Sequence, residues 1–464
     1  MSEDIEYVGY WWLPEEPANM VAGKLLLTSG DEITLELEGA FRPELTQEPR
    51  FNPALILGVS NKCGEITLHR CHQSRSALTV SGYLTSNFQA GRAFVGVHFD
   101  AEEKIRFTKL TVCYDHLDAW VNRRDFHVEP APGFRFTIHY EPSPAVTAAI
   151  PDYEIAIGNS GSYRVGNTQV TIAQKAYIAV SSAQGKPLDD CLKMMHDIRD
   201  FLSLAMGAPT HPVKTMGDTG TSKPGLHGEE EFGGPVEVHY PVNRWTVEAK
   251  PIHSDDMPFT LLDVQDDIEV YLTNWLRKAE ELRPVYDLLF SVVYNPDLYL
   301  VNAFLMLTQA VETYHRRQIG GSYQTDEVYR QGLYQRFVEV IPSDLDKSFK
   351  QSLKEGKLKF ANEYSLRKRL ADLMDRLSSS IPIGFLGSRR EVSSFITKVC
   401  VTRNYLTHYT PELKKRSAQD QELRAITRRL RAVLEMCLLK ETGFDYDTIR
   451  RIVSTRSRYR YLLE

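Results

Sequence analysis

Three residues near the C-terminus combine side chains that can act on a phosphodiester. The segment RNYLTHYT, residues 403–410, places Arg403, Asn404 and His408 at the end of an apolar stretch. A guanidinium pairs with phosphate oxygens, and an imidazole exchanges protons near neutral pH. These are the groups that RNA cleavage without a metal requires: a base for the ribose 2′-hydroxyl, an acid for the departing oxygen and a cation for the phosphate.

A helix is expected to carry the three residues. It starts near Ser388 and stops near Tyr409, because Pro411 disfavours helical geometry in the residue before it. Apolar residues recur at helical spacing and form its buried face: Val392, Phe395, Ile396, Val399 and Cys400.

The spacing of the three residues predicts which of them can act together. Asn404 and His408 are four residues apart and share one face, so the amide can orient the imidazole. Arg403 and His408 are five apart, about 140° around the helix axis. One helix therefore cannot easily aim both at one phosphate, and we expect a second copy of the chain, related by two-fold symmetry, to complete the site.

Spacing alone is weak support for this interpretation. The segment RAFVGVH places Arg92 and His98 at a similar separation, but it alternates like a strand in an acidic region, so we interpret it as a chance match. Around Arg403 the setting is a helix end in a basic region, with KKR at 414–416 just downstream.

Charge and periodicity divide the chain into two expected domains, residues 1–260 and 261–464. The net charge is −6, yet residues from 265 onward hold 33 Lys+Arg against 26 Asp+Glu, a net +7, which leaves −13 before them. The basic half is the better candidate for binding nucleic acid. The acidic N-terminus, the absence of about 18 consecutive apolar residues and six scattered cysteines predict a cytoplasmic protein without membrane contact.

Short alternating segments rich in Val, Ile, Thr and aromatics dominate the first half and predict strands of a β-sandwich or barrel-like body. They include KLLLT, EITLELEGAF, ALILGV, EITLHR, AFVGVHF and FRFTIHY. One helix is expected within this half, over about 187–206. The sequence thus predicts an α+β, two-domain chain in which a β-rich domain with one helix precedes an all-α bundle.

The second half changes to helical periodicity. In NPDLYLVNAFLMLTQAVETYHRRQIGG, Asn295 is the expected N-cap, Pro296 the first helical residue and Gly320 the stop. Other helices are expected at about 265–290, 326–340, 344–355, 364–380, 389–409, 418–442 and 446–456.

Two segments of the chain resemble known families. RNYLTHY resembles the motif of HEPN domains, helical modules whose ribonuclease members carry Arg, then four to six residues beginning with a polar one, then His. The helix with AFLMLTQAVETYHRR is similar to the first HEPN helix. At the other end, YVGYWWLPEE, GKLLLTSGDEITLELEGAF and EITLHRC are similar to the N-terminal domain of ApeA-type proteins.

This resemblance implies a bacterial antiviral effector that arrests an infected cell by cutting its RNA, with tRNA as an expected substrate. It assigns catalysis to Arg403, Asn404 and His408 and implies a homodimer through the HEPN helices, no cofactor and no metal. The β-rich domain is expected to sense a phage-derived trigger, a protein. Basic residues expected to contact RNA are Arg316, Arg317, Lys414, Lys415 and Arg416.

Two alternatives stay open on the sequence alone. Glu312, His315 and the arginines that follow can line an RNA cleft, or they can form a solvated helix end. The helical half can also be a non-catalytic dimerisation or nucleotide-binding module beside a β domain that binds a ligand or a protein. That reading is favoured if Arg403 and His408 are buried and paired within one chain.

Overall fold

A computed structural model describes most of the chain. The described residues are 4–28, 32–42, 51–78, 84–133, 135–224, 230–232, 234–242, 251–378 and 387–463. They form two compact units. The β-rich unit comprises 1–202, 209–254 and 260–269, and the helical unit comprises 203–208, 255–259 and 270–464. The expected division lies between 260 and 261; in the structure, 203–208 and 255–259 belong to the helical unit and 260–269 to the β-rich unit.

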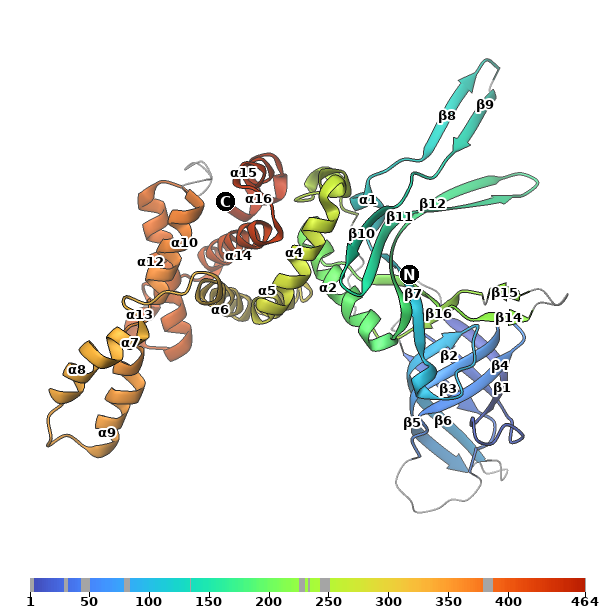
Figure 1. Ribbon diagram of the computed structural model, residues 1–464, viewed down its shortest axis with the longest axis horizontal. Coiled ribbons are helices and arrows are strands. Elements are labelled where there is room, and N and C mark those ends of the chain that lie inside the picture. The colour runs from blue at the N-terminus through green and yellow to red at the C-terminus, as the bar shows by residue number, and fades with distance from the viewer. Residues whose placement is uncertain are drawn as a thin grey trace. The chain divides into compact units, whose positions relative to one another are not determined.

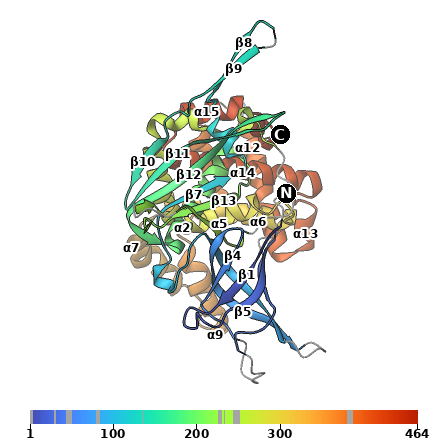
Figure 2. The same cartoon turned by 90° about the vertical axis from the view of Figure 1, so that its right-hand side faces the viewer.

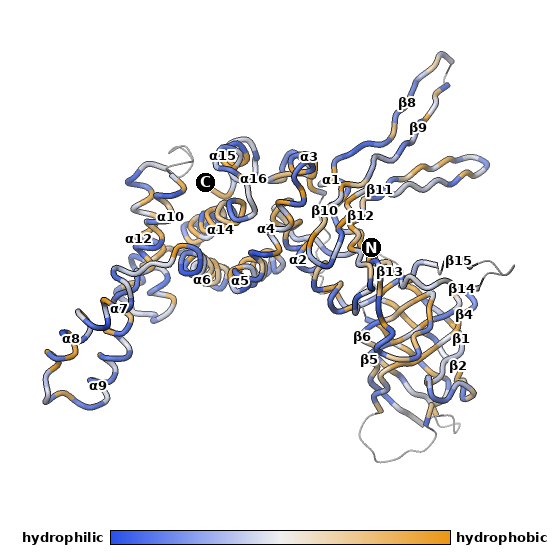
Figure 3. The backbone as a smooth tube through the Cα atoms, viewed as in Figure 1, coloured by the Kyte–Doolittle hydropathy of each residue, from blue (hydrophilic) through white to orange (hydrophobic). Residues whose placement is uncertain are grey.

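Six antiparallel strands close into a barrel at the start of the β-rich unit (Figure 1). They are β1 (Ile5–Trp12), β2 (Val21–Leu27), β3 (Ile33–Leu37), β4 (Leu55–Ser60), β5 (Gly64–Leu78) and β6 (Leu84–Val95). The order β6-β3-β2-β1-β4-β5 is completed by pairing of β5 with β6. Apolar and polar residues alternate along these strands (Figure 3), so every second side chain enters the barrel core. Because β5 and β6 pair with each other, neither strand is an edge of the barrel in the part that the structure describes.

Glycines make room for one large ring inside this barrel. Trp11 is fully buried, and a Cβ added to Gly58 would lie 2.2 Å from its ring. A Cβ on Gly23 would lie 3.1 Å from the same ring. The tryptophan therefore occupies space that side chains on the neighbouring strands β4 and β2 would otherwise fill.

The sheet continues from the barrel through further antiparallel strands. They are, in order outward from β6, β16 (Val236–His239), β13 (Pro212–Asp218), β7 (Arg106–Tyr114), β12 (Val170–Pro187), β11 (Tyr153–Val165) and β10 (Val146–Ile150). Helix α2 (Leu188–Met206), which confirms the expected helix, packs on this sheet, where the buried Tyr114 hydroxyl donates to the Met195 carbonyl over 3.0 Å. The short helix α1 (Leu117–Val121) and the hairpin β14 (Ser222–Pro224) and β15 (Glu230–Phe232) complete the unit.

Two long hairpins project from this unit (Figures 1 and 2). One consists of β8 (Phe126–Ala131) and β9 (Arg135–Tyr140), and the other is the distal half of β11 and β12. Strand register places six apolar or aromatic residues on one face of the first hairpin: Phe126, Val128, Pro130, Phe136, Ile138 and Tyr140. Tyr140 packs on the backbone of Gly161 in the second hairpin.

The second unit is helical, as the sequence predicts. Its helices are α4 (Ile268–Glu281), α5 (Arg283–Val293), α6 (Leu300–Gln318), α10 (Leu366–Ser378), α12 (Arg389–His408), α13 (Pro411–Lys414), α14 (Asp420–Thr442), α15 (Tyr446–Thr455) and α16 (Ser457–Leu463), with α3 (Leu261–Val264) in the β-rich unit just before them. The long α14 is buried on most sides and packs against α6 at the centre. None of the helices within the described ranges is long and apolar enough to cross a lipid bilayer.

Helix α6 starts later than the sequence suggests. It begins at Leu300 with Tyr299 as its N-cap, so the expected cap at Asn295 is wrong. Residues 295–298 instead form a turn in which the Leu298 amide donates to the Asn295 carbonyl over 3.2 Å. Pro296 suits this turn as well as it suits a first helical turn, which is why the local pattern is ambiguous.

Between α6 and α10 the chain forms a projecting helical arm, residues 322–363 (Figure 1). The first half contains α7 (Asp326–Tyr329), the π-helical stretch η4 (Arg330–Tyr334) and α8 (Gln335–Glu339). The second half contains α9 (Lys347–Gln351), the π-helical stretch η5 (Ser352–Lys357) and η6 (Leu358–Phe360). A bridge between Ser322 and Glu363 closes the base of the arm.

Candidate active site

Helix α12 presents the candidate residues at its C-terminal end. Its N-terminus is fixed by a capping box in which the Ser388 hydroxyl accepts from the Glu391 amide and the Glu391 carboxylate accepts from the Ser388 amide. The buried face consists of Phe395, Ile396, Val399 and Thr402. The helix ends at His408 because Tyr409 adopts a left-handed conformation, with φ of 52°, ahead of Pro411.

The three predicted residues lie together at this end. The Arg403 side chain is 38% exposed, and Asn404 and His408 are both exposed. Arg403 Nη1 donates to the side-chain oxygen of Asn404 over 3.1 Å. The amide oxygen is therefore engaged with the guanidinium, whereas we expected the amide to orient the imidazole.

Glu312 of α6 joins the site from the neighbouring helix. Its carboxylate lies 3.8 Å from Arg403 Nη2 and accepts a hydrogen bond from Arg316 over 3.2 Å. With only 20% of its side chain exposed, Glu312 is the less solvated partner of the Arg403 pair. Its position beside the apolar stripe of α6 could be read from the sequence, but its partner on α12 could not.

His315, one turn further along α6, is fully buried, so for this residue both alternatives, an open RNA cleft and a solvated helix end, are wrong. Arg369 Nη1 lies 3.0 Å from His315 Nδ1, and a guanidinium can only donate, so Nδ1 is the acceptor. Nε2 therefore carries the proton and donates to Asp372 over 3.0 Å. Burial lowers the pKa of His315, and the hydrogen bond to Asp372 offsets only part of that effect.

The buried imidazole belongs to a network that ends at the candidate site. Arg369, itself buried, also lies 3.9 Å from Glu363, and Glu363 pairs with Arg316. Arg316 in turn binds Glu312, which faces Arg403. Charged side chains thus connect α10, the base of the arm, α6 and α12, and they fix the environment in which the Arg403 guanidinium lies.

The residues expected to contact RNA fall into two groups. Arg316 is held by two carboxylates, and Arg317 donates to the Glu281 carbonyl over 2.6 Å, so both are engaged within the protein. Lys414, Lys415 and Arg416 are exposed at and just beyond α13. Arg416 also borders a shallow groove along α12 that is lined by Ser393, Ser394, Thr397, Lys398 and Val401.

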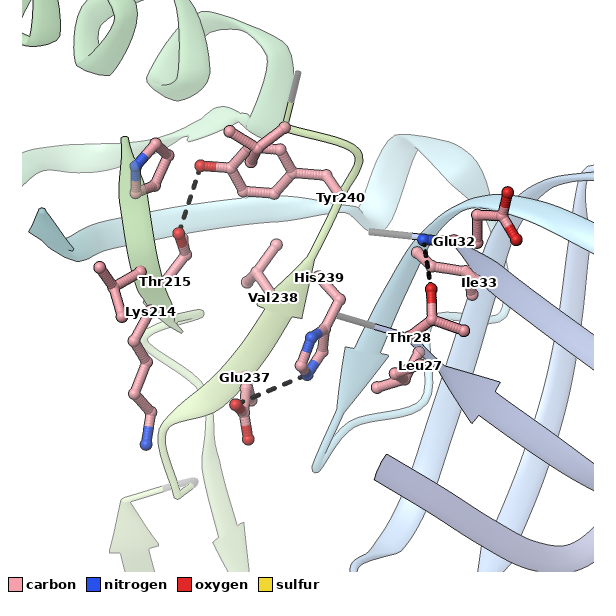
Figure 4. Close-up of a pocket in the computed structure, with 13 residues that line it drawn as sticks. Leu27, Thr28, Glu32, Ile33, Lys214, Thr215, Glu237, Val238, His239 and Tyr240 are labelled. Carbon is pink, nitrogen blue, oxygen red and sulfur yellow. Dashed lines mark hydrogen bonds and ion pairs between the residues drawn. The ribbon is translucent and has the colours of Figure 1, made fainter. Parts of the chain in front are cut away.

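A small polar cavity lies in the β-rich unit where β13 and β16 meet the end of the β2–β3 hairpin (Figure 4). Glu237 and His239 approach each other to 3.6 Å on one side, and the hydroxyls of Thr215 and Tyr240 lie 3.2 Å apart on another. Its volume of about 80 Å³ holds a few water molecules at most. We therefore assign it no nucleotide or sugar.

Fold and site together define a class of protein: a β-rich unit followed by a helical unit that displays an Arg-x₄-His motif at a helix end. Residues 6–275 match the family ApeA N-terminal domain 1, and residues 305–448 match the family Apea-like HEPN. The chain belongs to the ApeA family, with a C-terminal HEPN domain. This pair of domains fits an anti-phage effector and supports a nuclease. No curated protein and no solved structure matches the chain.

Proposed function

We propose that the chain is a metal-independent endoribonuclease that acts in anti-phage defence by cutting cellular RNA. The observation that carries this proposal is the half-buried Arg403 beside the exposed Asn404 and His408 at the end of α12, inside the region that matches a HEPN family. Transfer RNA is the substrate that the family resemblance suggests. A phage protein that acts on the β-rich unit is the proposed trigger.

The proposed reaction is cleavage through the ribose 2′-hydroxyl. A base removes the hydroxyl proton, the 2′-oxygen bonds to the adjacent phosphorus, and the bond from phosphorus to the 5′-oxygen breaks. An acid returns a proton to that leaving oxygen, so the products carry a 2′,3′-cyclic phosphate and a 5′-hydroxyl. His408 is the proposed acid or base. Arg403 stabilises the charge that gathers on the non-bridging oxygens.

A second copy supplies the group that one chain lacks. The reaction needs an acid and a base at once, and each α12 offers one imidazole, at position 408. Arg403 and His408 also lie about 140° apart around an ideal helix. Two chains related by a two-fold axis would place two histidines and two arginines along one seam, and we propose that this homodimer is the active form.

One observation favours the non-catalytic alternative in part. Arg403 is paired within its own chain, with Glu312 and Asn404, as that alternative expects. The exposure of His408 is what the nuclease requires. A single ion pair at 3.8 Å and a side chain that is 38% exposed leave the guanidinium partly solvated and able to contact a phosphate, so the nuclease is the better-supported function.

Replacing His408 with alanine tests the proposal. His408→Ala should abolish RNA cleavage and cell toxicity while the fold and the dimer persist, because an exposed side chain at a helix end contributes little to packing. His72→Ala is a matched control, since His72 is also exposed and bonds only to Gln89 among the interactions described. Sequencing of the RNA ends after induced expression identifies the substrate and the cyclic phosphate.

Two results would argue against the mechanism. Full cleavage by His408→Ala protein would remove the imidazole from the reaction. Loss of cleavage in excess chelator, restored by added metal, would replace acid–base catalysis with metal catalysis.

A further inference from the structure

The second half of the helical arm is unusually basic. Between 347 and 359 the chain holds five lysines, Lys347, Lys350, Lys354, Lys357 and Lys359, and one acidic residue, Glu355. The first four lysines recur every three or four residues along α9 and η5, and Lys359 follows on η6. Lys347, Lys357 and Lys359 are exposed, and the other two are half-buried.

Aromatic rings accompany these lysines. Phe349 is 51% exposed and Phe360 is 52% exposed, although phenylalanine has no polar atom that water can satisfy. The Lys359 ammonium lies 5.8 Å from the centre of the Phe360 ring. Cations interleaved with exposed rings are the combination by which proteins hold a phosphate backbone and stack its bases.

The arm starts and ends beside the candidate active site. Its base is the bridge between Ser322 and Glu363, and Glu363 pairs with Arg316. Arg316 binds Glu312, which faces Arg403. Three ion pairs therefore connect Arg403 with Glu363 at the base of the arm.

We propose that the lysine face of the arm, defined here as Lys347, Lys354, Lys357 and Lys359 with Phe349 and Phe360, binds RNA beside the cleavage site. The inference rests on the proposed function, because it assigns this surface to the substrate of that site. The four lysines lie within one short segment, residues 347–359, so their charges are close enough together to contact neighbouring phosphates of one backbone.

The residues of the arm that suit a contact with another protein lie on its other half, away from the lysine face. An apolar row at helical spacing contains Leu333 on η4, Phe337 on α8 and Val340 at the C-cap of α8, which are 40%, 38% and 74% exposed. An apolar partner or a second copy would be drawn to that row. The lysines gather instead on α9, η5 and η6, where a polyanion is the complementary ligand.

Binding should be measured on the His408→Ala protein, so that the RNA is not cut. The probe is a fluorescent single-stranded RNA of 20 nucleotides, and Kd is followed from low to high salt. Exchanging the four lysines for glutamine should reduce the slope of log Kd against log salt by about 3, at roughly 0.7 per phosphate contact. At 0.15 M salt the affinity should fall on the order of 100-fold. Phe349→Ala with Phe360→Ala should weaken binding roughly tenfold per ring with the slope unchanged.

A matched control removes the same charge elsewhere on the helical unit. Arg424, Lys440, Arg451 and Arg460 are exposed on α14, α15 and α16, and their exchange for glutamine should change Kd by less than about threefold. Circular dichroism and thermal unfolding should show that both quadruple variants keep the fold.

Three results would overturn the proposal: an unchanged salt slope in the arm variant, an equal loss in the control, or a changed oligomeric state with unchanged RNA affinity. The last result would identify the lysine face as a contact between copies. Failure of the proposed function is distinguishable, because RNA that binds the arm but is never cleaved by the wild type contradicts only the nuclease.

Discussion

Glu312 offers the sharpest test of how the site is built. Glu312→Gln keeps the shape of the side chain and removes the charge that faces Arg403. We expect this exchange to leave the guanidinium less well held and therefore to slow the chemical step. The same exchange makes the site more positive, so binding of RNA should be unchanged or tighter.

The magnitude follows from the geometry of the pair. Two unit charges separated by 3.8 Å attract by about 1 kcal/mol in bulk water and about 4 kcal/mol in a protein-like dielectric. Exposures of 38% and 20% place this pair near the lower end, at about 1–2 kcal/mol. The expected result is a kcat lowered roughly 5- to 30-fold. Removal of Arg403 itself should cost about 100- to 1,000-fold.

The assay is a double-mutant cycle on RNA cleavage. Rates are measured for wild type, Glu312→Gln, Arg403→Lys and the double variant, with Arg403→Lys chosen so that activity remains measurable. If Glu312 acts by positioning the Arg403 guanidinium, Glu312→Gln should lower the rate of the Arg403→Lys protein by little further. Glu422→Gln is the matched control. Glu422 of α14 pairs at 2.9 Å with Lys398, which lies on α12 like Arg403. Glu422 is 51% exposed and lies away from the motif.

Additive losses in the cycle would refute the reasoning, because they would mean that Glu312 acts independently of Arg403. A raised KM with unchanged kcat would refute it as well, since it would make the carboxylate a substrate-binding group. Either result would mean that Glu312 acts on the substrate or the reaction itself and not by positioning Arg403.

Two further predictions concern stability. Burial lowers the pKa of His315 in the folded chain. The unfolded chain therefore binds a proton near pH 6.5 that the folded chain does not bind. The free energy of unfolding should fall as the pH drops from about 7 towards 5, by up to about 1.4 kcal/mol per pH unit. Urea titrations should show this slope reduced in His315→Gln and retained in His408→Gln. Gly58→Ala, whose new Cβ would meet the Trp11 ring at 2.2 Å, should destabilise the barrel by about 1–3 kcal/mol or more, whereas Gly234→Ala, with open space around it, should be tolerated in the same measurement.

Local patterns were sufficient to predict the fold class and the element that carries the site. Period-two alternation identified the strands of the first half, and a capping serine with a downstream proline bounded α12 to within one residue at each end. The HEPN resemblance of RNYLTHY and the ApeA resemblance of the N-terminus are confirmed by the family matches. The catalytic roles of Arg403, Asn404 and His408 stay a prediction.

Contacts between distant segments could not be predicted in the same way. The sequences of β5 and β6 alone do not show that these strands pair and close a barrel, because this pairing depends on the strands between them. His315 has the polar neighbours of a solvated helix end, yet Arg369, 54 residues later, makes its burial possible. Glu312 meets Arg403 only because α6 and α12 pack together.

The π-helical stretches of the arm have a consequence for chain length. A turn closed by i→i+5 hydrogen bonds holds about one residue more than an α-helical turn of the same axial extent. Such a turn occurs once in each half of the arm, at Arg330–Tyr334 and at Ser352–Lys357. Deletion of one residue in either stretch can therefore be absorbed by a return to α geometry, with the base at Ser322 and Glu363 unmoved. Each half of the arm can therefore lose one residue and keep its length, while the site beside it keeps its shape.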